Sequence, residues 1–186
     1  MRTALETFGR IDALVNNVGI GAAGDGPVKH LTEEALDLTL SVNFKSAWLM
    51  TKACLPAMEA QGAGAILNIS SLASIAGHHM MAYETSKAAM NRMTEATALS
   101  VARKGVRCNA ILPGLMDTPM AIEGISRKRG IPADQLREER GAMVPLGHMG
   151  TAWDVAHAAL FLCSDEAAFI SGALLPVDGG QGARRG

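Results

Sequence analysis

The chain has 186 residues, 48% hydrophobic and 19% charged, so it can bury the core of one ordinary domain and is not a disordered or supercharged polypeptide. Its 17 Lys and Arg residues against 18 Asp and Glu residues give a formal net charge of -1, which argues against a nucleic-acid binder, a class that is usually basic. The sequence contains neither an apolar run near the ~18 residues of a membrane span nor the apolar stretch of a signal peptide, which predicts a cytoplasmic protein.

The first third of the chain predicts a helix, a strand, a loop and a second helix. Residues 2–8 are expected to end a helix that Gly9 stops, and residues 11–16 form a short buried strand. Residues 18–30 predict a loop. Thr32 then caps a helix with two glutamates in its first turn, and this helix runs to about residue 60, where Pro56 is expected to kink or break it.

The rest of the chain continues the alternation of apolar strands with long helices. Residues 115–150 are mixed, with charges clustered between Arg127 and Arg140 that predict a solvated, mobile lid, and the tail from Gln181 to Gly186 is expected to be loose. The remaining strands are predicted at 64–70, 106–112 and 174–177, and the remaining helices at 80–104 and 152–164.

Strands separated by helices indicate right-handed crossovers and a parallel sheet, and continuous apolar strands indicate that helices cover both of its faces. The sequence shows no internal repeat and no second domain, so residues 1–186 are expected to form one α/β domain. Three widely spaced cysteines, Cys54, Cys108 and Cys163, predict buried free thiols, and no metal site is expected.

Tyr83 and Lys87 are the residues that first suggest chemistry. They lie four positions apart in a predicted helix and so share one face of it. A phenol with a pKa of about 10 is a poor proton donor and acceptor at neutral pH, but a nearby ammonium lowers that pKa. The pair predicts a tyrosine acid/base for an alcohol or carbonyl oxygen, although the same spacing also describes an ordinary solvated pair.

Polar and turn residues at the strand ends favour the catalytic interpretation. Asn68-Ile69-Ser70-Ser71 ends one strand, Asn16-Asn17-Val18-Gly19 ends another, and Pro113-Gly114 ends a third. Ligands of open parallel sheets bind beyond the carboxyl ends of the strands. Taken singly, each motif is also explained by a turn.

Together these motifs resemble the short-chain dehydrogenase/reductase family. The resemblance covers nearly the whole chain and implies a Rossmann-like, doubly wound parallel sheet. It also implies an enzyme that interconverts a secondary alcohol and a ketone with NAD or NADP as cofactor. The matching landmarks are Asn16 to Gly19, Asn43, Asn68 to Ser71, Tyr83-x-x-x-Lys87, Pro113-Gly114 through Thr118, and Val177 to Gly180.

The resemblance also implies a role for each site residue. Tyr83 is the catalytic acid/base, Lys87 lowers its pKa and holds the nicotinamide ribose, and Asn43 positions a water in a proton relay towards Lys87. Ser71 stabilises the charge on the substrate oxygen. The other residues expected at the cofactor are Asn17, Val18, Gly19, Pro113, Gly114, Met116 and Thr118.

The serine assignment is open between two neighbours. Ser71 keeps the family's strand alignment, whereas Ser70 keeps its common distance to Tyr83. We favour Ser71, because a one-residue deletion is easier in the loop at residues 77–79 than in a strand.

The family's first glycine-rich, phosphate-binding turn has no counterpart here. By resemblance the chain begins in the helix before the family's fourth strand, so we expect an N-terminally truncated sheet of about four strands and an unpaired edge on the strand at 11–16. Met1 is then an internal methionine, from a misplaced start or a partial gene. The residue that separates NAD from NADP is absent as well.

Two functional interpretations follow. The first is an oxidoreductase with residues 115–150 as substrate lid, assembled as a homodimer or homotetramer through helices 33–60 and 80–104. The second is a truncated, cofactor-free remnant that acts only as a partner subunit or is an inactive fragment. An unrelated binding module fits poorly, because it leaves the Ser/Tyr/Lys set unexplained.

Overall fold

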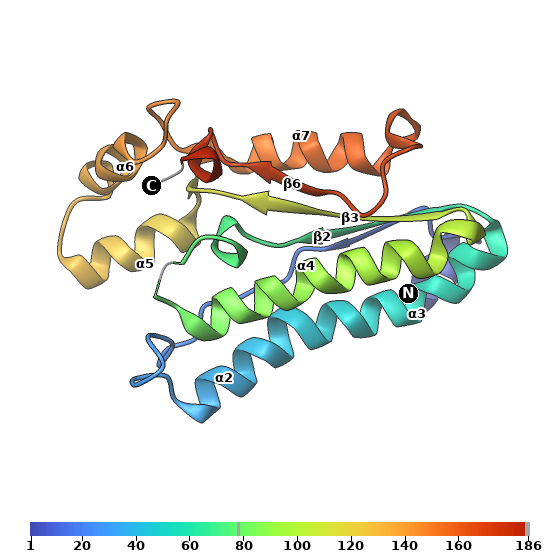
Figure 1. Cartoon of the computed structure of the whole chain (residues 1–186), viewed down its shortest axis with the longest axis horizontal. Helices are drawn as coiled ribbons and strands as arrows, with labels where there is room; N and C mark the ends of the chain where they lie inside the picture. The colour runs from blue at the N-terminus through green and yellow to red at the C-terminus, as the bar shows by residue number, and fades with distance from the viewer. Residues whose placement is uncertain (78, 185–186) are drawn as a thin grey trace.

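A parallel sheet forms the centre of the molecule. The computed structural model describes residues 1–77 and 79–184. Within them four strands pair in the order β1-β2-β3-β6, and every pairing is parallel (Figure 1). The strands are β1 (Ala13–Asn16), β2 (Gly64–Ile69), β3 (Val106–Pro113) and β6 (Leu174–Val177). The α/β fold and its four strands agree with the prediction.

Helices cover both faces of this sheet. After the short α1 (Arg2–Phe8), which ends at the left-handed Gly9, the chain forms β1 and then the helices of one face. These are α2 (Glu33–Leu40), α3 (Ser46–Gln61) and α4 (Met81–Val101), and α7 (Ala152–Cys163) covers the other face (Figure 1). The arrangement makes three layers, which is what continuous apolar strands require.

The core is divided between the two sides of the sheet. Ile66 and Cys108 of the central strands pack with Cys54 and Met58 of α3. The neighbouring Leu67 and Ile111 belong to a second cluster with Leu162 of α7. Alternate strand residues therefore face opposite helical layers, as the pleat of a strand dictates. Cys54 and Cys108 are buried free thiols as predicted, whereas Cys163 is only half-buried.

The helix predicted from residue 33 to about 60 is interrupted, but not at Pro56. Pro56 lies inside α3, on a side of the helix that is exposed to solvent. Water can therefore bond the backbone carbonyl that the proline, which has no amide hydrogen, leaves unpaired. The interruption is a π-helical turn at Ser41–Lys45. Such turns are frequent at functional sites, and this one carries Asn43. The prediction of a break at Pro56 was wrong in its position.

The segment after β3 forms a small lobe at one end of the sheet. It contains β4 (Met116–Asp117), α5 (Pro119–Arg129), α6 (Ala133–Ala142) and β5 (Gly150–Thr151), with β4 and β5 paired in parallel (Figure 1). Ile122, Leu136 and Met149 form its own apolar cluster. The lobe therefore has a core separate from those of the main sheet.

The two ends of the described chain differ from each other in packing. Among the described residues β1 pairs only with β2, which leaves the unpaired edge that the sequence predicts, and Val15 on it is half exposed. The tail is not uniformly loose, because Gln181–Ala183 forms a 3-10 turn and the Gln181 side chain accepts a hydrogen bond from the Leu115 amide. Within the described residues no helix has the length and apolarity needed to span a membrane.

Candidate active site

A cavity of about 920 Å³ opens at the carboxyl ends of the strands, where the small lobe meets the sheet. Most of the residues predicted for the site line it: Asn17, Gly19, Ser71, Tyr83, Lys87, Pro113, Gly114, Met116 and Thr118. Among the described residues, Val18 and Asn43 do not. Strand ends of a parallel sheet are the expected place for a ligand.

Tyr83 and Lys87 reach the cavity from the first turns of α4. The Lys87 side chain is buried and its Nζ donates to the carbonyl oxygen of Ile69 at 2.8 Å. The same Nζ lies 5.7 Å from the centre of the Tyr83 ring. One helical turn thus brings an ammonium beside a phenol, and the end of β2 holds the ammonium in place.

Burial shifts the pKa of both groups towards the neutral forms. It lowers the pKa of Lys87 from 10.5 to about 8, and it raises the pKa of Tyr83, while a hydrogen bond with Ser71 acts in the opposite direction on the phenol. Lys87 is therefore mostly protonated at neutral pH, and it loses its charge at a pH where an exposed lysine keeps it.

The two candidate serines occupy different environments. The Ser71 hydroxyl lies near enough to the Tyr83 phenol to lower its pKa, and its Oγ accepts a hydrogen bond from the Ala73 amide. Ser70 is 2% exposed and its Oγ donates to the backbone carbonyl of Lys87 at 3.1 Å. Ser71 is placed to contact a ligand oxygen next to Tyr83, whereas the Ser70 hydroxyl fastens β2 to α4. His78, in the loop to which we assigned the shortened spacing, lies outside the described residues.

Asn43 sits behind the cavity wall. Its side chain donates to the Ile20 carbonyl oxygen at 2.9 Å and accepts from the Ile20 amide at 2.8 Å, and it also donates to Ser86. These bonds hold the loop after β1 so close to α4 that a Cβ on Gly19 would lie 3.2 Å from Lys87 Nζ and 3.7 Å from Asn43 Oδ1. Gly19 thus lies close to both the Asn43 side chain and the Lys87 ammonium.

The remaining predicted residues of the loop after β1 differ in whether they line the cavity. Asn17 lines the cavity, while Val18 is 66% exposed and does not line it. The preceding Asn16 is buried and donates to Asn68 Oδ1 at 2.8 Å, which joins the ends of β1 and β2. The first of these strand-end asparagines is therefore structural.

The end of β3 meets the end of β6 across a close backbone contact. The Gly114 amide donates to the Val177 carbonyl at 3.0 Å, and a Cβ on Gly114 would lie 2.7 Å from the Cβ of Asp178. Only glycine fits there. Two motifs that lie far apart in sequence, Pro113-Gly114 and Val177 to Gly180, are thus one structural unit, of which Pro113 and Gly114 line the cavity.

Asp25 is a residue of the site region that the sequence did not indicate. Its two carboxylate oxygens accept hydrogen bonds from the amides of Ala82 and Tyr83, each at 3.0 Å. α4 has no side-chain cap of its own at Met80, so a residue from the distant loop 18–30 supplies the cap. A single aspartate among glycines carries no signal of such a contact.

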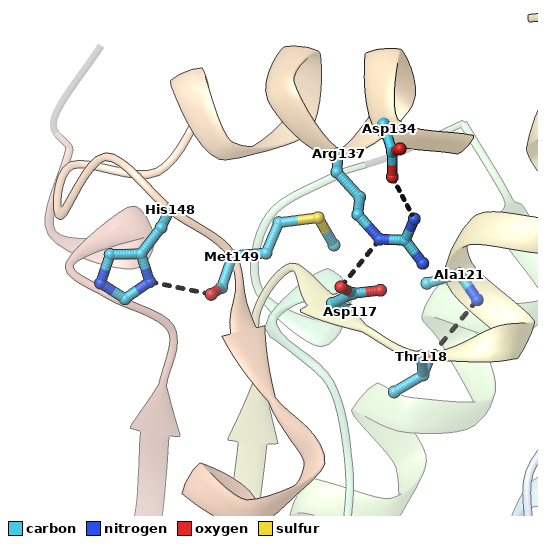
Figure 2. A network of polar contacts seen from close by, with 7 residues as sticks. All are labelled: Asp117, Thr118, Ala121, Asp134, Arg137, His148 and Met149. Carbon is cyan, nitrogen blue, oxygen red and sulfur yellow. Dashed lines mark hydrogen bonds and ion pairs between the residues drawn. The ribbon is translucent and has the colours of Figure 1, made fainter. Parts of the chain in front are cut away.

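Polar contacts within the small lobe join α6 to the end of β4, next to Thr118. Figure 2 shows Arg137 of α6 reaching Asp117 at 2.9 Å and Asp134 at 2.8 Å, with Thr118 capping α5 through the Ala121 amide. Arg129 also pairs with Glu139. The run from Arg127 to Arg140, predicted to be merely solvated, therefore contains defined ion pairs, and its last member lines the cavity.

Comparison with known proteins gives a consistent result. A family model described as enoyl-(acyl carrier protein) reductase matches residues 1–181. The chain is 40% identical over 177 residues to 2-(R)-hydroxypropyl-CoM dehydrogenase of Xanthobacter autotrophicus, covering 94% of this chain and 68% of the relative.

Solved structures agree in both fold and sequence. A protein of Burkholderia xenovorans assigned to the short-chain dehydrogenase/reductases aligns with a TM-score of 0.92 and 41% identity over 100% of this chain and 70% of its own. An NAD⁺-bound xylitol dehydrogenase aligns with a TM-score of 0.88 and 30% identity, over 96% of this chain and 72% of its own. The chain thus spans roughly two thirds to three quarters of the length of these relatives.

Proposed function

Because the chain belongs to the short-chain dehydrogenase/reductase family, we propose that it is an NAD(P)-dependent oxidoreductase that interconverts a secondary alcohol and a ketone. The observation that carries the proposal is the convergence of Ser71, Tyr83 and Lys87 on one cavity, with the Ser71 hydroxyl lowering the pKa of the phenol and the Lys87 Nζ 5.7 Å from the centre of its ring.

The cavity has the groups that the nicotinamide end of such a cofactor requires. The Lys87 ammonium and the Tyr83 hydroxyl can bond ribose hydroxyls, and Asn17, Gly19 and the stretch from Pro113 to Thr118 line the same space. The close approach of Gly19 to Lys87 leaves the ammonium accessible to a ligand, where a larger residue would cover it. When bound, NAD(P)(H) supplies or accepts the hydride. The NAD⁺ held by the related xylitol dehydrogenase supports a nicotinamide cofactor, and NAD and NADP both remain candidates.

The chain's own residues handle the proton. In the reductive direction Tyr83 gives its phenolic proton to the substrate carbonyl oxygen, and in the oxidative direction its phenolate takes the alcohol proton. Ser71 donates a hydrogen bond to the same oxygen and stabilises the charge that grows on it. Protonated Lys87 favours the phenolate through its charge. Asn43 serves as the anchor for a water that passes protons to Lys87.

The second candidate, a cofactor-free remnant, has its own supporting observation. The helix that follows the glycine-containing loop, α2, is closed to an anion at its N-terminus. The Thr32 side chain caps it through the Ala35 amide, and Glu33 and Glu34 fill its first turn. A pyrophosphate therefore has no helix N-terminus at this loop, which favours weak nucleotide binding by the 186-residue chain.

Our proposal for assembly is a homodimer or homotetramer through α2, α3 and α4. These helices expose large apolar side chains, among them Leu38, Trp48, Leu49 and Leu99. Such side chains are costly on a monomer surface when they gather in patches. We also propose that the small lobe acts as the substrate lid and that the protein is cytoplasmic.

The test of the proposed function is hydride transfer followed at the nicotinamide absorbance, with a panel of ketones and millimolar NADH or NADPH. We expect turnover by the parent chain and its loss, by at least about a hundredfold, in Tyr83→Phe, which removes only the hydroxyl. Circular dichroism of the variant checks that the fold is unchanged. Equal rates for the two proteins would refute the acid/base role, and absence of nucleotide oxidation with every ketone would favour the remnant.

A further inference from the structure

One side chain in the cavity has a charge that no other described residue balances. Arg140, near the end of α6, lines the cavity, and its Nε is buried without a hydrogen-bond partner. Within residues 1–77 and 79–184 no acidic group pairs with it, whereas Arg137, one turn earlier, binds two carboxylates. Arg140 as a whole is half-buried, but a buried polar atom is seldom left without a partner, so its Nε needs an explanation.

The charge of the whole cavity points the same way. Of the described residues that line it, only Lys87 and Arg140 are charged, and none is an aspartate or glutamate. Lys87 bonds the Ile69 carbonyl and takes part in the proposed chemistry. Arg140 is therefore the charged cavity residue to which the proposed chemistry assigns no role. Burial also lowers the pKa of the Arg140 guanidinium, the direction expected for a cation that lacks a counter-charge.

Much of the cavity wall is apolar. Residues of α5 and α7, including Met120, Ile125, Val155 and Ala156, line the same space. An apolar wall with one guanidinium suits a molecule with a carbon skeleton and one anionic end. Arginine recognises planar oxyanions such as carboxylates through two parallel hydrogen bonds, which gives orientation as well as affinity.

We propose that the substrate carries an anionic substituent, a carboxylate or similar oxyanion, which Arg140 binds while Tyr83 and Ser71 hold the reacting oxygen. This inference rests on the proposed function, since it names the substrate class of the same site. Arg140 then acts as a specificity-determining residue: it holds the acid at one end of the cavity so that the carbonyl lies at the other.

The test compares binding of keto acids with binding of their uncharged methyl esters. Acetoacetate, levulinate and the methyl ester of each are titrated calorimetrically into the parent chain and into Arg140→Met. The parent is expected to bind at least one acid on the order of ten- to a hundredfold more tightly than its ester, the value of one charge-assisted contact. Arg140→Met is expected to bind acid and ester equally.

Three further variants keep the test decisive. Arg140→Lys should retain part of the preference for the acid, and Arg140→Gln replaces the Met variant if that protein does not fold. Arg127→Met is the matched control, because Arg127 is an exposed arginine of α5 that does not line the cavity, and it should keep the full preference.

The outcomes separate this inference from the proposed function. Equal binding of acids and esters by the parent, or a preference that survives in Arg140→Met, overturns the assignment of Arg140. It is equally overturned if Arg140→Met weakens NADH or NADPH binding and leaves acid binding unchanged, because the guanidinium then serves a cofactor phosphate. Turnover is recorded independently, so a chain that binds acids through Arg140 but oxidises no nucleotide supports this inference and refutes the proposed function.

Discussion

Replacing Lys87 by methionine is expected to make the protein more stable at neutral pH while abolishing hydride transfer. Lys87 is 3% exposed, and its ammonium donates a hydrogen bond to the Ile69 carbonyl. Its pKa of about 8, against 10.5 for the ordinary group, means that the folded state disfavours the ammonium. At about 1.4 kcal/mol for each tenfold change in the protonation equilibrium, the buried charge costs on the order of 3 kcal/mol at pH 7.

Methionine has a similar shape and no charge, so it removes this cost. It also leaves the Ile69 carbonyl without its donor, which costs about 1–2 kcal/mol. Lys87→Met should therefore raise the free energy of unfolding by about 1–2 kcal/mol at pH 7.

The gain must disappear as the pH rises, and the sign follows from proton binding. Between a pH of about 8 and 10.5 the unfolded parent keeps the Lys87 proton and the folded parent has lost it. Stability rises with pH wherever the unfolded state binds more protons, so the parent gains stability through this window and the variant does not. The advantage of Lys87→Met should fall by about 2 kcal/mol between pH 7 and pH 9.5 and then vanish or reverse.

Urea denaturation of both proteins at several pH values provides the measurement. Lys104→Met, which removes one exposed lysine, corrects for the change in net charge. A variant less stable than the parent at pH 7, or a difference that does not change with pH, would refute the argument that Lys87 is held as a strained, buried ammonium.

Three other predictions follow from the site geometry. Ser71→Ala should reduce hydride transfer by about a hundredfold or more, and Ser70→Ala far less, because the Ser71 hydroxyl acts on the phenol whereas the Ser70 hydroxyl bonds the Lys87 backbone. Steady-state rates provide the measurement, and a larger loss for Ser70→Ala would show that our alignment of the chain with its family is wrong. Asp25→Ala should lower the free energy of unfolding, measured by urea denaturation, by about 1–2 kcal/mol. Asp25→Asn should lose less stability because it keeps an acceptor oxygen, and equal losses for the two variants would contradict the capping role. Calorimetric titration of the 186-residue chain with NADH and NADPH should give dissociation constants weaker than micromolar, since α2 offers no N-terminus to a pyrophosphate; a micromolar constant would show that another surface binds it.

Local sequence patterns sufficed for the order and type of the main elements. Gly9 and Gly105 end their helical segments in the left-handed conformation, and Thr32 caps its helix with its own side chain. Each of these signals acts within a few residues, so tertiary packing has little chance to override it. The alternation of strand and helix then fixed the parallel sheet through the handedness of crossovers.

The break in the second predicted helix shows where local reasoning ends. Proline is the strongest local breaker, yet Pro56 stays inside α3 because that side of the helix faces water. The actual irregularity at Ser41–Lys45 coincides with Asn43, whose side chain bonds both backbone groups of Ile20. That partner lies 23 positions away in the sequence and has no recognisable motif, so the contact that accompanies the π-helical turn was invisible before the fold.

The residues of the candidate site were predictable where a local pattern marks them and were missed where only the fold brings them together. Tyr83 and Lys87 share a helical face by spacing alone, whereas Arg137 and Arg140 stand in one charged run with nothing local to tell them apart. The fold separates them: α6 directs Arg137 to Asp117 of β4 (Figure 2), whereas Arg140 lines the cavity and pairs with no acid among the described residues. A charged run is usually a solvated face, but this one contains ion pairs, and the residue that we propose for substrate choice is the one whose charge no described residue balances. Lys87 follows the same logic, because its charge is costly to the fold and is retained at the point where the proposed chemistry needs it.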